Sequence, residues 1–257
     1  MKKYLLASDL DGTLIKHNDG ANAPRTILGK DKVILKQFSE DGNIFILSTG
    51  RDKISTFALF EREKIFLDNS YFITSNGAEI YNSDKECIYK KILPENIAEA
   101  VLKIFIETNN SDLECRMFDG EVERKIESFG EYNLITEPII NICIFSKSSN
   151  INEAQNFYKL IENKIKQVTI TMNNWYVDII PEGVSKASSI NHVLKLQEDS
   201  IDIKVIAIGD SWNDISMFKI ADASYTFHSS PENVKSEADY VVEHLYEALE
   251  SAFNNKY

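Results

Sequence analysis

The sequence predicts an α/β protein in which a parallel-sheet core is interrupted by an inserted α+β unit. Two stretches, residues 1–81 and 182–257, alternate short apolar runs with helix-like segments. Such alternation indicates right-handed βαβ units, so both ends of the chain are expected to build one parallel sheet. The intervening residues 82–181 combine helix-like segments with extended runs typical of an antiparallel sheet. A length of 257 residues suits a core with a smaller insertion.

The elements of the core follow from the positions of its apolar runs. In the N-terminal stretch, strands and helices are expected in turn over residues 4–9, 31–41, 44–48, 52–64 and 71–74. After Lys186 a helix, a strand, a helix and a strand are expected over residues 187–196, 205–208, 214–221 and 239–242. A polar loop is expected over residues 18–24. Short apolar runs bounded by polar clusters are typical of buried strands.

The insertion has its own regular pattern. Helices are expected over residues 94–108 and 151–166, and extended segments over residues 113–118, 139–145, 168–172 and 175–180. Segments of this kind are expected to pair antiparallel and to pack against the two helices. The predicted division is therefore a core of residues 1–81 and 182–257 with an inserted unit of residues 82–181.

Composition argues against several classes of protein. The net charge of −12 disfavours general binding to nucleic acid, whose phosphates attract surfaces rich in lysine and arginine. No apolar stretch approaches the roughly 20 residues that span a bilayer, and the apolar run after Lys3 is too short for a signal peptide. Cys87, Cys115 and Cys143 lack disulfide or zinc spacing. We expect a cytoplasmic monomer or weak homo-oligomer without membrane or nucleic-acid partners.

Two aspartates directly follow the first apolar run. Asp9 and Asp11 are two positions apart, and Gly12 allows the chain to turn sharply behind them. One carboxylate can attack phosphorus while its neighbour moves a proton, and a later acidic cluster can help them hold a divalent cation. An Asp-Gly pair is also an ordinary turn, so this pattern alone leaves a structural interpretation open.

Three further polar clusters favour the catalytic interpretation. Residues 48–51 and 209–214 each follow an apolar run, and Lys186 lies between them along the chain. Ligands bind at the carboxyl ends of the strands in open α/β sheets, so the clusters are expected to meet at one edge. The alternative is structural, because Ser, Thr, Asn and Asp also cap helices and a lone lysine is normally a solvated surface group.

These four clusters, in this order, resemble the motifs of the haloacid dehalogenase-like (HAD) superfamily, and within it the Cof-type sugar-phosphate phosphatases. Residues 75–80 and 178–186 are also similar in sequence to that subclass. The resemblance covers both ends of the chain. It implies the HAD fold, a Rossmann-like parallel-sheet core, with residues 82–181 as an α+β cap that excludes water and selects the substrate.

The resemblance assigns roles to the acidic residues. Asp9 is the implied nucleophile, which forms an aspartyl-phosphate, and it is also a ligand of Mg²⁺. Asp11 is the implied general acid and base, and its backbone carbonyl also binds the metal. Asp210 is the implied second carboxylate ligand. Asp214 is implied to support the metal site without binding the metal directly. Magnesium prefers one or two carboxylates together with waters and a substrate phosphate, which suits this set.

The resemblance also implies how the phosphate is bound. The donors are the Leu10 amide, the Thr49 hydroxyl, the Gly50 amide, the Lys186 ammonium and the Asn213 side chain. Such donors stabilise the charge of the transferring phosphoryl group and carry most of the rate enhancement. Arg51 and Asn76 adjoin the motifs and are candidates for substrate contacts. Trp212, a bulky residue inside the fourth motif, is expected to narrow the entrance.

The predicted function is a magnesium-dependent phosphatase, a phosphoric monoester hydrolase that acts on small phosphorylated metabolites, with sugar phosphates first. A phosphosugar mutase or other phosphotransferase would use the same aspartyl-phosphate and shield it from water, and the motifs do not separate these outcomes. A catalytically silent phosphosugar-binding regulator is disfavoured, because a binder needs neither a nucleophile nor a proton donor. A dehalogenase is disfavoured because its chemistry does not need the second aspartate or the metal cluster.

Overall fold

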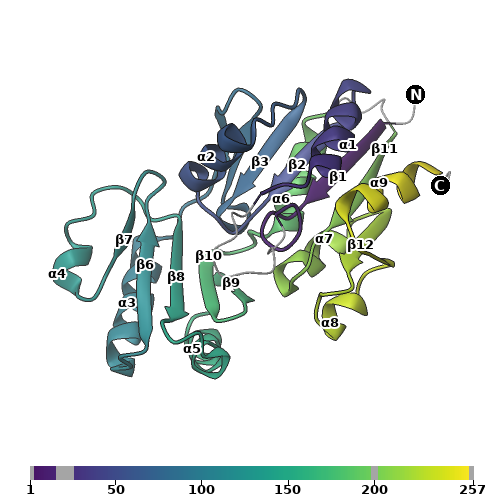
Figure 1. Cartoon of the computed structure of the whole chain (residues 1–257). Helices are drawn as coiled ribbons and strands as arrows, with labels where there is room; N and C mark the ends of the chain where they lie inside the picture. The colour runs from purple at the N-terminus through teal and green to yellow at the C-terminus, as the bar shows by residue number, and fades with distance from the viewer. Residues whose placement is uncertain (1–2, 16–25, 198–201, 255–257) are drawn as a thin grey trace.

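Two β-sheets of different size organise the computed structural model, which describes residues 3–15, 26–197 and 202–254 (Figure 1). The strands of the larger sheet are β1 (Lys3–Ser8), β2 (Ile44–Ser48), β3 (Ser70–Thr74), β4 (Glu79–Asn82), β5 (Cys87–Lys90), β11 (Ile203–Ile208), β12 (Ala223–Phe227) and β13 (Tyr240–Val242). Its helices are α1 (Gly29–Glu40), α2 (Lys53–Glu63), α6 (Lys186–Lys195), α7 (Ile215–Phe218), α8 (Glu232–Lys235) and α9 (Leu245–Asn254), with 3₁₀ turns η1 (Ser75–Gly77) and η2 (Trp212–Asp214). The loop expected over residues 18–24 lies outside the described residues.

The strand order of the larger sheet brings both ends of the chain together. The order is β13-β12-β11-β1-β2-β3-β4-β5, and the pairs from β13 to β3 are all parallel. Ala7 of β1 stands opposite both Ala207 of β11 and Ile46 of β2, so these three central strands end level with one another. The predicted α/β fold is confirmed, and the segments that follow β1, β2 and β11 leave the sheet at one edge.

Three strands of this sheet were not predicted. The chain reverses at η1, so β4 pairs antiparallel with β3 and β5 pairs antiparallel with β4. The expectation of a purely parallel sheet is therefore wrong at this edge. Strand β12 escaped prediction because it buries Ser224 and Thr226, whose hydroxyls are satisfied by Asp239 at 2.6 Å and Ser230 at 2.9 Å. Pairing of these hydroxyls removes the cost of burying them, which an apolar pattern cannot reveal.

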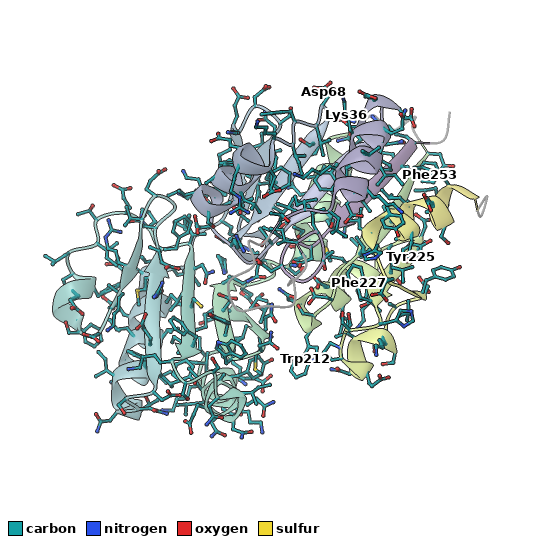
Figure 2. The ribbon with its side chains drawn as sticks, viewed as in Figure 1. Lys36, Asp68, Trp212, Tyr225, Phe227 and Phe253 are labelled. Carbon is teal, nitrogen blue, oxygen red and sulfur yellow. The ribbon has the colours of Figure 1, made fainter. Side chains whose placement is uncertain are left out.

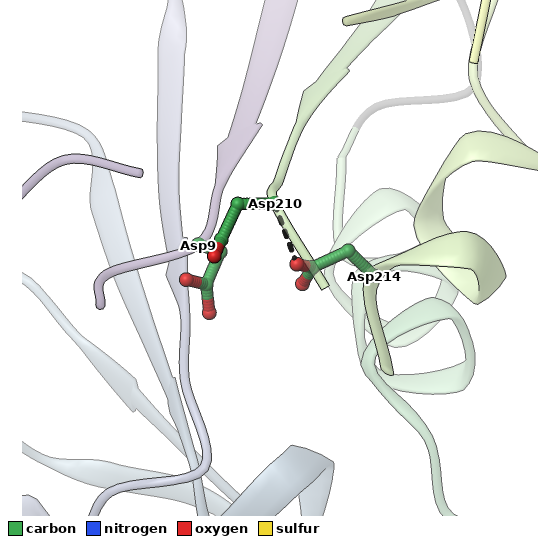
Figure 3. A group of neighbouring side chains, drawn as sticks. All are labelled: Asp9, Asp210 and Asp214. Atoms are coloured by element: carbon green, nitrogen blue, oxygen red, sulfur yellow. Dashed lines mark hydrogen bonds between the residues drawn. The ribbon is translucent and has the colours of Figure 1, made fainter. Parts of the chain in front are cut away.

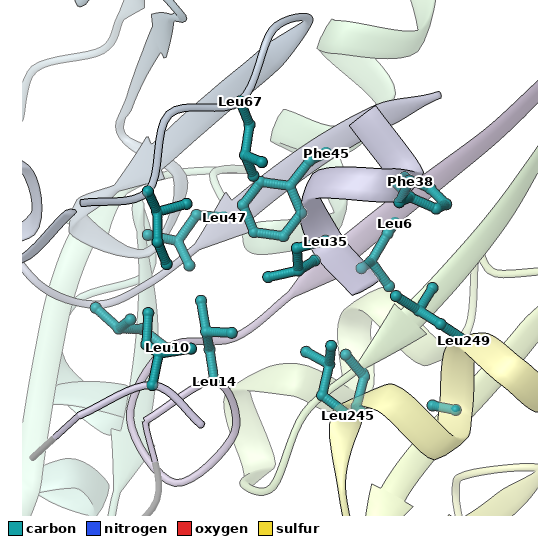
Figure 4. Packing of buried hydrophobic residues seen from close by; sticks show 14 of the residues in the cluster. Leu6, Leu10, Leu14, Leu35, Phe38, Phe45, Leu47, Leu67, Leu245 and Leu249 are labelled. Atoms are coloured by element: carbon teal, nitrogen blue, oxygen red, sulfur yellow. The ribbon is translucent and has the colours of Figure 1, made fainter. Parts of the chain in front are cut away.

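Helices cover both faces of the larger sheet. On one face Leu35 of α1 and Leu249 of α9 pack against strand residues such as Leu6 and Phe45 (Figure 4). On the other face α6, α7 and α8 pack against the residues that alternate with these, such as Leu5. A sheet buried on both faces explains why its strands read as continuous apolar runs.

The smaller sheet is antiparallel and carries helices on one face. Its order is β7-β6-β8-β10-β9, with strands β6 (Leu113–Phe118), β7 (Glu123–Lys125), β8 (Asn141–Ser146), β9 (Val168–Asn173) and β10 (Tyr176–Pro181). Its helices are α3 (Glu95–Thr108), α4 (Phe129–Tyr132) and α5 (Ile151–Lys164). Val177 and Ile179 of β10 join the buried cluster under α3 and α5. Successive side chains of a strand point to opposite faces, so Tyr176 and Asp178 lie on the other face.

An apolar cluster joins the two sheets. Ala78 and Val184 from the larger unit pack with Phe118, Ile140 and Ile180 from the smaller unit, and all five are buried. The chain passes between the two units after β5 and again after β10, so this cluster lies beside both crossings. Such packing attaches the smaller sheet to the larger unit beside η1 and the start of α6.

The described part of the chain contains no helix that combines the length and the apolar character required to cross a membrane. Cys87, Cys115 and Cys143 are free thiols, and none forms a disulfide.

Candidate active site

Asp9 sits where β1 leaves the sheet. Its backbone N–H donates to the Ile208 carbonyl at 3.0 Å, which continues the pairing of β1 with β11 by one residue. The chain then turns at Gly12, which has a φ of +88°. A Cβ atom at Gly12 would overlap the Asp210 carboxylate, so only glycine lets the two loops approach this closely. The turn thus brings the first and fourth motifs together.

Lys186 begins α6 and lies between two carboxylates. Its ammonium Nζ is 2.5 Å from Asp9 Oδ1 and 2.6 Å from Asp214 Oδ1, and its side chain is 1% exposed. The preceding Ser185 caps the helix, with its side chain accepting from the Ser188 N–H, and so fixes where the lysine starts. Burial opposes the charge of Lys186, but Asp214 and Asp9 outweigh it and hold the pKa of Lys186 above its ordinary value.

Asp214 and Asp210 belong to the turn after β11 (Figure 3). Asp214 Oδ2 accepts from the N–H groups of Asp210 at 3.0 Å and Ser211 at 2.9 Å, so both of its oxygens are engaged once Lys186 is counted. The Thr13 hydroxyl donates to Asp210 Oδ1 at 3.1 Å. Asp214 therefore orders the turn, while Asp210 points toward Asp9.

The three carboxylates carry more negative charge than Lys186 neutralises. Asp9, Asp210 and Asp214 each offer an oxygen within 4.8 Å of the others. Burial raises the pKa of Asp9 well above its ordinary value although Lys186 opposes this, and burial together with the Asp214 charge raises that of Asp210 to about 7. Crowded carboxylate oxygens with this excess charge fit a hard divalent cation such as Mg²⁺, which prefers oxygen ligands.

The second motif contributes Thr49, Gly50 and Arg51. Thr49 Oγ1 accepts from the Arg51 N–H at 3.1 Å, which leaves the hydroxyl proton able to donate to another group. The Arg51 guanidinium binds both oxygens of Asp11, at 2.6 Å from Nε and 2.5 Å from Nη2. Arg51 therefore pairs with the predicted general acid.

A chain of side-chain amides runs from the fourth motif to the smaller sheet. Asn213 Nδ2 donates to Asn76 Oδ1 at 3.1 Å, and Asn76 Nδ2 donates to Asp178 Oδ2 at 3.0 Å. At its other end, Asn213 Oδ1 accepts from the Ser211 hydroxyl at 2.5 Å. Asn76 thus contacts β10 of the smaller sheet as well as the predicted phosphate-binding residue Asn213.

A cavity of about 600 Å³ opens beside these groups. Lys186, Asn76 and Asn213 line it from the larger unit, and residues of α5 and β9 such as Tyr158 and Met172 line it from the smaller one. Trp212 also lines it, on the side of the larger unit nearest α5 and β9, and is 39% exposed (Figure 2). A small molecule in this cavity would touch both units at once.

A sequence profile of the haloacid dehalogenase-like hydrolases matches residues 6–248. The chain belongs to this family. The predicted membership is therefore confirmed, and the candidate site predicted from the HAD motifs lies at the edge of the larger sheet where Asp9, Lys186 and Asp210 meet.

Relatives of the chain within the HAD family carry phosphatase names. The 5-amino-6-(5-phospho-D-ribitylamino)uracil phosphatase YcsE of Bacillus subtilis is 25% identical over 242 residues, which cover 93% of this chain and 89% of that protein. A haloacid dehalogenase-like hydrolase from B. subtilis has a similar structure, with a TM-score of 0.81, 21% identity and coverage of 98% of this chain and 99% of that one. For a sugar phosphatase of HAD subclass IIB these values are 0.75, 19%, 97% and 98%. The structures establish the fold, and the family with its named relative supports phosphatase or phosphotransferase activity.

Most residues singled out in the sequence gather at one place. Asp9, Lys186, Asp210 and Asp214 form one cluster, in which Asp210 is half-buried and the other three are buried. Leu10 and Asp11 follow Asp9, with the Leu10 side chain buried in the core. Thr49, Gly50, Asn76 and Asn213 lie together, since the Asn76 N–H donates to the Thr49 carbonyl and a Cβ at Gly50 would lie 3.2 Å from Asn76 Nδ2.

Sequence reasoning missed three groups that the structure places in or beside this candidate site. Thr13 lies inside the first motif, and its place after Gly12 is the only signal for its bond to Asp210. Asp178 is a carboxylate within an otherwise apolar strand, which is itself a signal of a functional or paired group. The cavity residues of α5 and β9 carry no local pattern, because their proximity to Lys186 depends on how the two sheets pack.

Proposed function

We propose that the chain is a Mg²⁺-dependent phosphatase that hydrolyses small phosphorylated metabolites, sugar phosphates first, through an aspartyl-phosphate on Asp9. The observation that carries this proposal is the buried cluster in which Asp9 lies beside Lys186 and within reach of Asp210. Nucleophile, cation and acidic partner at one sheet edge are the parts that phosphoryl transfer requires. A purely structural ion pair would need only one carboxylate for the lysine.

The first half-reaction forms a bond between Asp9 and phosphorus. One Asp9 oxygen, Oδ1, is held by Lys186, so attack falls to Oδ2. As the bond from Asp9 Oδ2 to phosphorus forms, the bond from phosphorus to the leaving oxygen breaks, and Asp11 gives that oxygen a proton. Arg51 binds both oxygens of Asp11, so one of these bonds must be released for Asp11 to reach the leaving group.

The second half-reaction returns Asp9 to its free form. Asp11 takes a proton from water, the water oxygen attacks phosphorus, and the bond from phosphorus to Asp9 breaks to give inorganic phosphate. Throughout both steps the Lys186 ammonium, the Thr49 hydroxyl and the Asn213 amide are placed to balance the charge on the phosphoryl oxygens. The Leu10 and Gly50 amides belong to the same proposed cradle.

Asp9, Asp210 and the Asp11 carbonyl are the proposed ligands of Mg²⁺, and Asp214 orients the turn that carries Asp210. When bound, the ion would supply positive charge against the phosphate and the carboxylates. The excess negative charge of the cluster and the raised pKa of Asp210 support this assignment. Both oxygens of Asp214 are already engaged, which favours a supporting role for that residue.

We further propose that residues 82–181 provide a cap over a core of residues 1–81 and 182–257, with the correction that β5 within this range pairs with β4 of the larger sheet, so the cap itself begins after β5. The cavity between the two units is where the leaving group would lie, and Trp212 and Tyr158 are among the residues that line it. The named relatives support small phosphorylated substrates, since one is a phosphatase of a phosphorylated ribitylaminouracil and one similar structure is a sugar phosphatase. A phosphosugar mutase remains the rival within enzymes, and a silent phosphosugar-binding regulator the rival outside them.

Release of inorganic phosphate tests the proposal. The parent and Asp9→Asn are compared on sugar phosphates, nucleotides and phosphorylated cofactors, with Mg²⁺ and with a chelator. Release by the parent alone, and only with Mg²⁺, is the expected result. An isomeric sugar phosphate in place of free phosphate would indicate a mutase. Binding without turnover above the Asp9→Asn level would indicate a regulator.

A further inference from the structure

Asp178 is a carboxylate of the smaller sheet that faces the larger one. It lies on the face of β10 opposite α3 and α5 and is paired across the sheet with Cys143 of β8. Its Oδ2 accepts from Asn76 Nδ2 at 3.0 Å, and its Oδ1 accepts from Asn141 Nδ2 at 3.3 Å. Asn76 is separated from Asp178 by 102 positions, so this bond links the two units directly.

The charge of Asp178 gives the amide chain a direction. An ionised carboxylate only accepts hydrogen bonds, so Asn76 must turn its NH₂ group toward Asp178 and its oxygen away. That oxygen then accepts from the Asn213 NH₂ group, and the Asn213 oxygen accepts from the Ser211 hydroxyl. One carboxylate therefore decides which end of each amide carries the donors.

The backbone holds Asn76 in position for this chain. Asn76 has a φ of +53°, and asparagine is among the residues that tolerate this left-handed conformation. Its N–H donates to the Thr49 carbonyl at 3.0 Å, and the N–H of Ser75 donates to the Arg51 carbonyl at 2.8 Å. Gly50 leaves room for the side chain, because a Cβ there would lie 3.2 Å from Asn76 Nδ2. Because the backbone of Asn76 is fixed, the orientation of its side-chain amide is what remains to be determined by its hydrogen-bond partners.

We propose that Asp178 is a positioning residue of the phosphoryl site: it orients Asn76, and through Asn76 it makes Asn213 present its remaining N–H where the phosphoryl group binds. The packing of the smaller sheet is thereby coupled to the chemistry of the larger one. This inference rests on the proposed function, because Asn213 is there a donor to the phosphoryl oxygens. In this proposal Asp178 influences the residues that bind the phosphoryl group and not those that contact the leaving group. Its effect on kcat/KM should therefore be the same for substrates with different leaving groups.

The test is the substitution Asp178→Asn, which keeps the shape but lets position 178 donate as well as accept. We expect kcat/KM in Mg²⁺ to fall about tenfold, less than the loss of a direct oxyanion donor, and by the same factor for p-nitrophenyl phosphate and a hexose phosphate. Asn76→Ala should give a similar loss. The double variant should be no worse than Asn76→Ala alone, because both changes interrupt one chain.

Asp112→Asn is the matched control. Asp112 is also a hydrogen-bonded carboxylate of the smaller unit, but it binds Ser146 and Ser148 within that unit. Its variant should keep kcat/KM within about twofold, as expected for a site away from the chemistry. Three outcomes would overturn the proposal. They are a loss of kcat/KM in Asp178→Asn that is confined to the hexose phosphate, additive losses from Asp178→Asn and Asn76→Ala in the double variant, and an equal loss in Asp112→Asn.

A second readout separates this inference from the proposed function. Binding of inorganic phosphate in the presence of Mg²⁺ is measured by calorimetry for the parent, Asp178→Asn and Asp112→Asn. Affinity about tenfold weaker in Asp178→Asn alone supports the inference even if the parent releases no phosphate from any substrate. Equal affinity in all three proteins contradicts it, even if the parent is an active phosphatase whose activity depends on Asp9.

Discussion

The two units of the molecule contribute to the site in different ways. The larger sheet supplies buried charge, with Lys186 held between Asp9 and Asp214 at 2.5 and 2.6 Å. The smaller sheet supplies a carboxylate, Asp178, which is proposed to act on the phosphoryl group through Asn76 and Asn213. Buried charges in fixed positions interact strongly with a charged group beside them, whereas a carboxylate that acts through neutral amides has a weaker effect. Under the proposed function, the larger unit therefore carries the chemistry, while the smaller unit adjusts the site and selects the substrate.

The largest effect is expected from Asp9→Asn. Loss of the nucleophile should lower kcat by at least about 10⁴-fold, as in other enzymes that lose a covalent group. The fold should survive, because the substitution removes a buried carboxylate whose pKa is already raised by burial. Phosphate release measures the first effect and thermal unfolding the second. Retained turnover in a well-folded variant would show that Asp9 is not the nucleophile, and the proposed contrast between the two units would then fail.

Lys186→Met should destabilise the core unit more than any change considered in the smaller one. It leaves Asp9 and Asp214 without their cation, and breaking a buried pair from one side costs about 3 kcal/mol or more of unfolding free energy. The control is Lys103→Met on α3, an exposed lysine whose loss should change stability by about 0.5 kcal/mol or less. Urea unfolding measures both. Equal losses would show that the cluster is not a buried ionic centre.

Addition of Mg²⁺ should stabilise the parent without any substrate. An ion that binds only the folded state, and is present at a concentration of about 100 times its Kd, adds about 2.7 kcal/mol to the unfolding free energy. Asp210→Asn should lose this response, whereas Asp178→Asn should keep it because Asp178 contacts the amide chain and not the carboxylate cluster. The melting temperature with and without Mg²⁺ is the measurement. A response unchanged in Asp210→Asn would argue against the proposed ligands.

The contribution of Asp178 should depend on pH. Burial raises its pKa to about 6, against the hydrogen bonds from Asn141, Cys143 and Asn76, while the Glu123 charge adds to the increase. Above this value the carboxylate is ionised and directs the amide chain, and below it the carboxyl group is protonated and does so less. The ratio of kcat/KM for the parent to that for Asp178→Asn should therefore fall from about ten at neutral pH toward one below about pH 5.

Stability provides an independent check on the sign of this pH effect. Because the pKa of Asp178 is higher in the folded state than its ordinary value, the folded protein binds the proton more tightly than the unfolded chain. Relative to Asp178→Asn, the parent should gain stability as the pH falls through about 6 toward the ordinary pKa of about 4. A kinetic ratio that stays constant across this range would show that Asp178 only supports the fold.

Trp212→Ala should give the smallest effect. Trp212 lines the cavity but has no place in the carboxylate cluster, so KM for a hexose phosphate should rise about fivefold with little change in kcat. Phe66→Ala, at an exposed aromatic residue outside the cavity, serves as the control. A fall in kcat of the same size for every substrate would assign Trp212 to the chemistry instead.

The core site could be read from the sequence because its parts are local. Asp9, Thr49 and Asp210 each follow an apolar strand by one or two residues, and parallel strands that end level bring such residues together. The partners of these residues could not be read in this way. The bonds from Asn213 to Asn76 and from Asn76 to Asp178 join residues 137 and 102 positions apart, and no local pattern specifies them.

The fold was predictable to a similar extent. Strands buried on both faces produced continuous apolar runs, whereas β12 hides its burial behind paired hydroxyls and β4 depends on a reversal at Ser75 and Asn76. The two left-handed residues of that reversal are held by bonds to Thr49 and Arg51, which are distant in sequence. Tertiary contacts, rather than local propensity, therefore determine the parts that the sequence left open.

Direct detection of phosphate on Asp9 tests the central claim most directly. The parent and Asp11→Asn are mixed with a hexose phosphate or p-nitrophenyl phosphate and Mg²⁺, quenched in acid and analysed by mass spectrometry of peptides. We predict an added phosphoryl group on the peptide that contains Asp9, in greater yield in Asp11→Asn because the water step is slowed there. Phosphate release that continues in Asp9→Asn, with no phosphorylated peptide in either protein, would contradict the account.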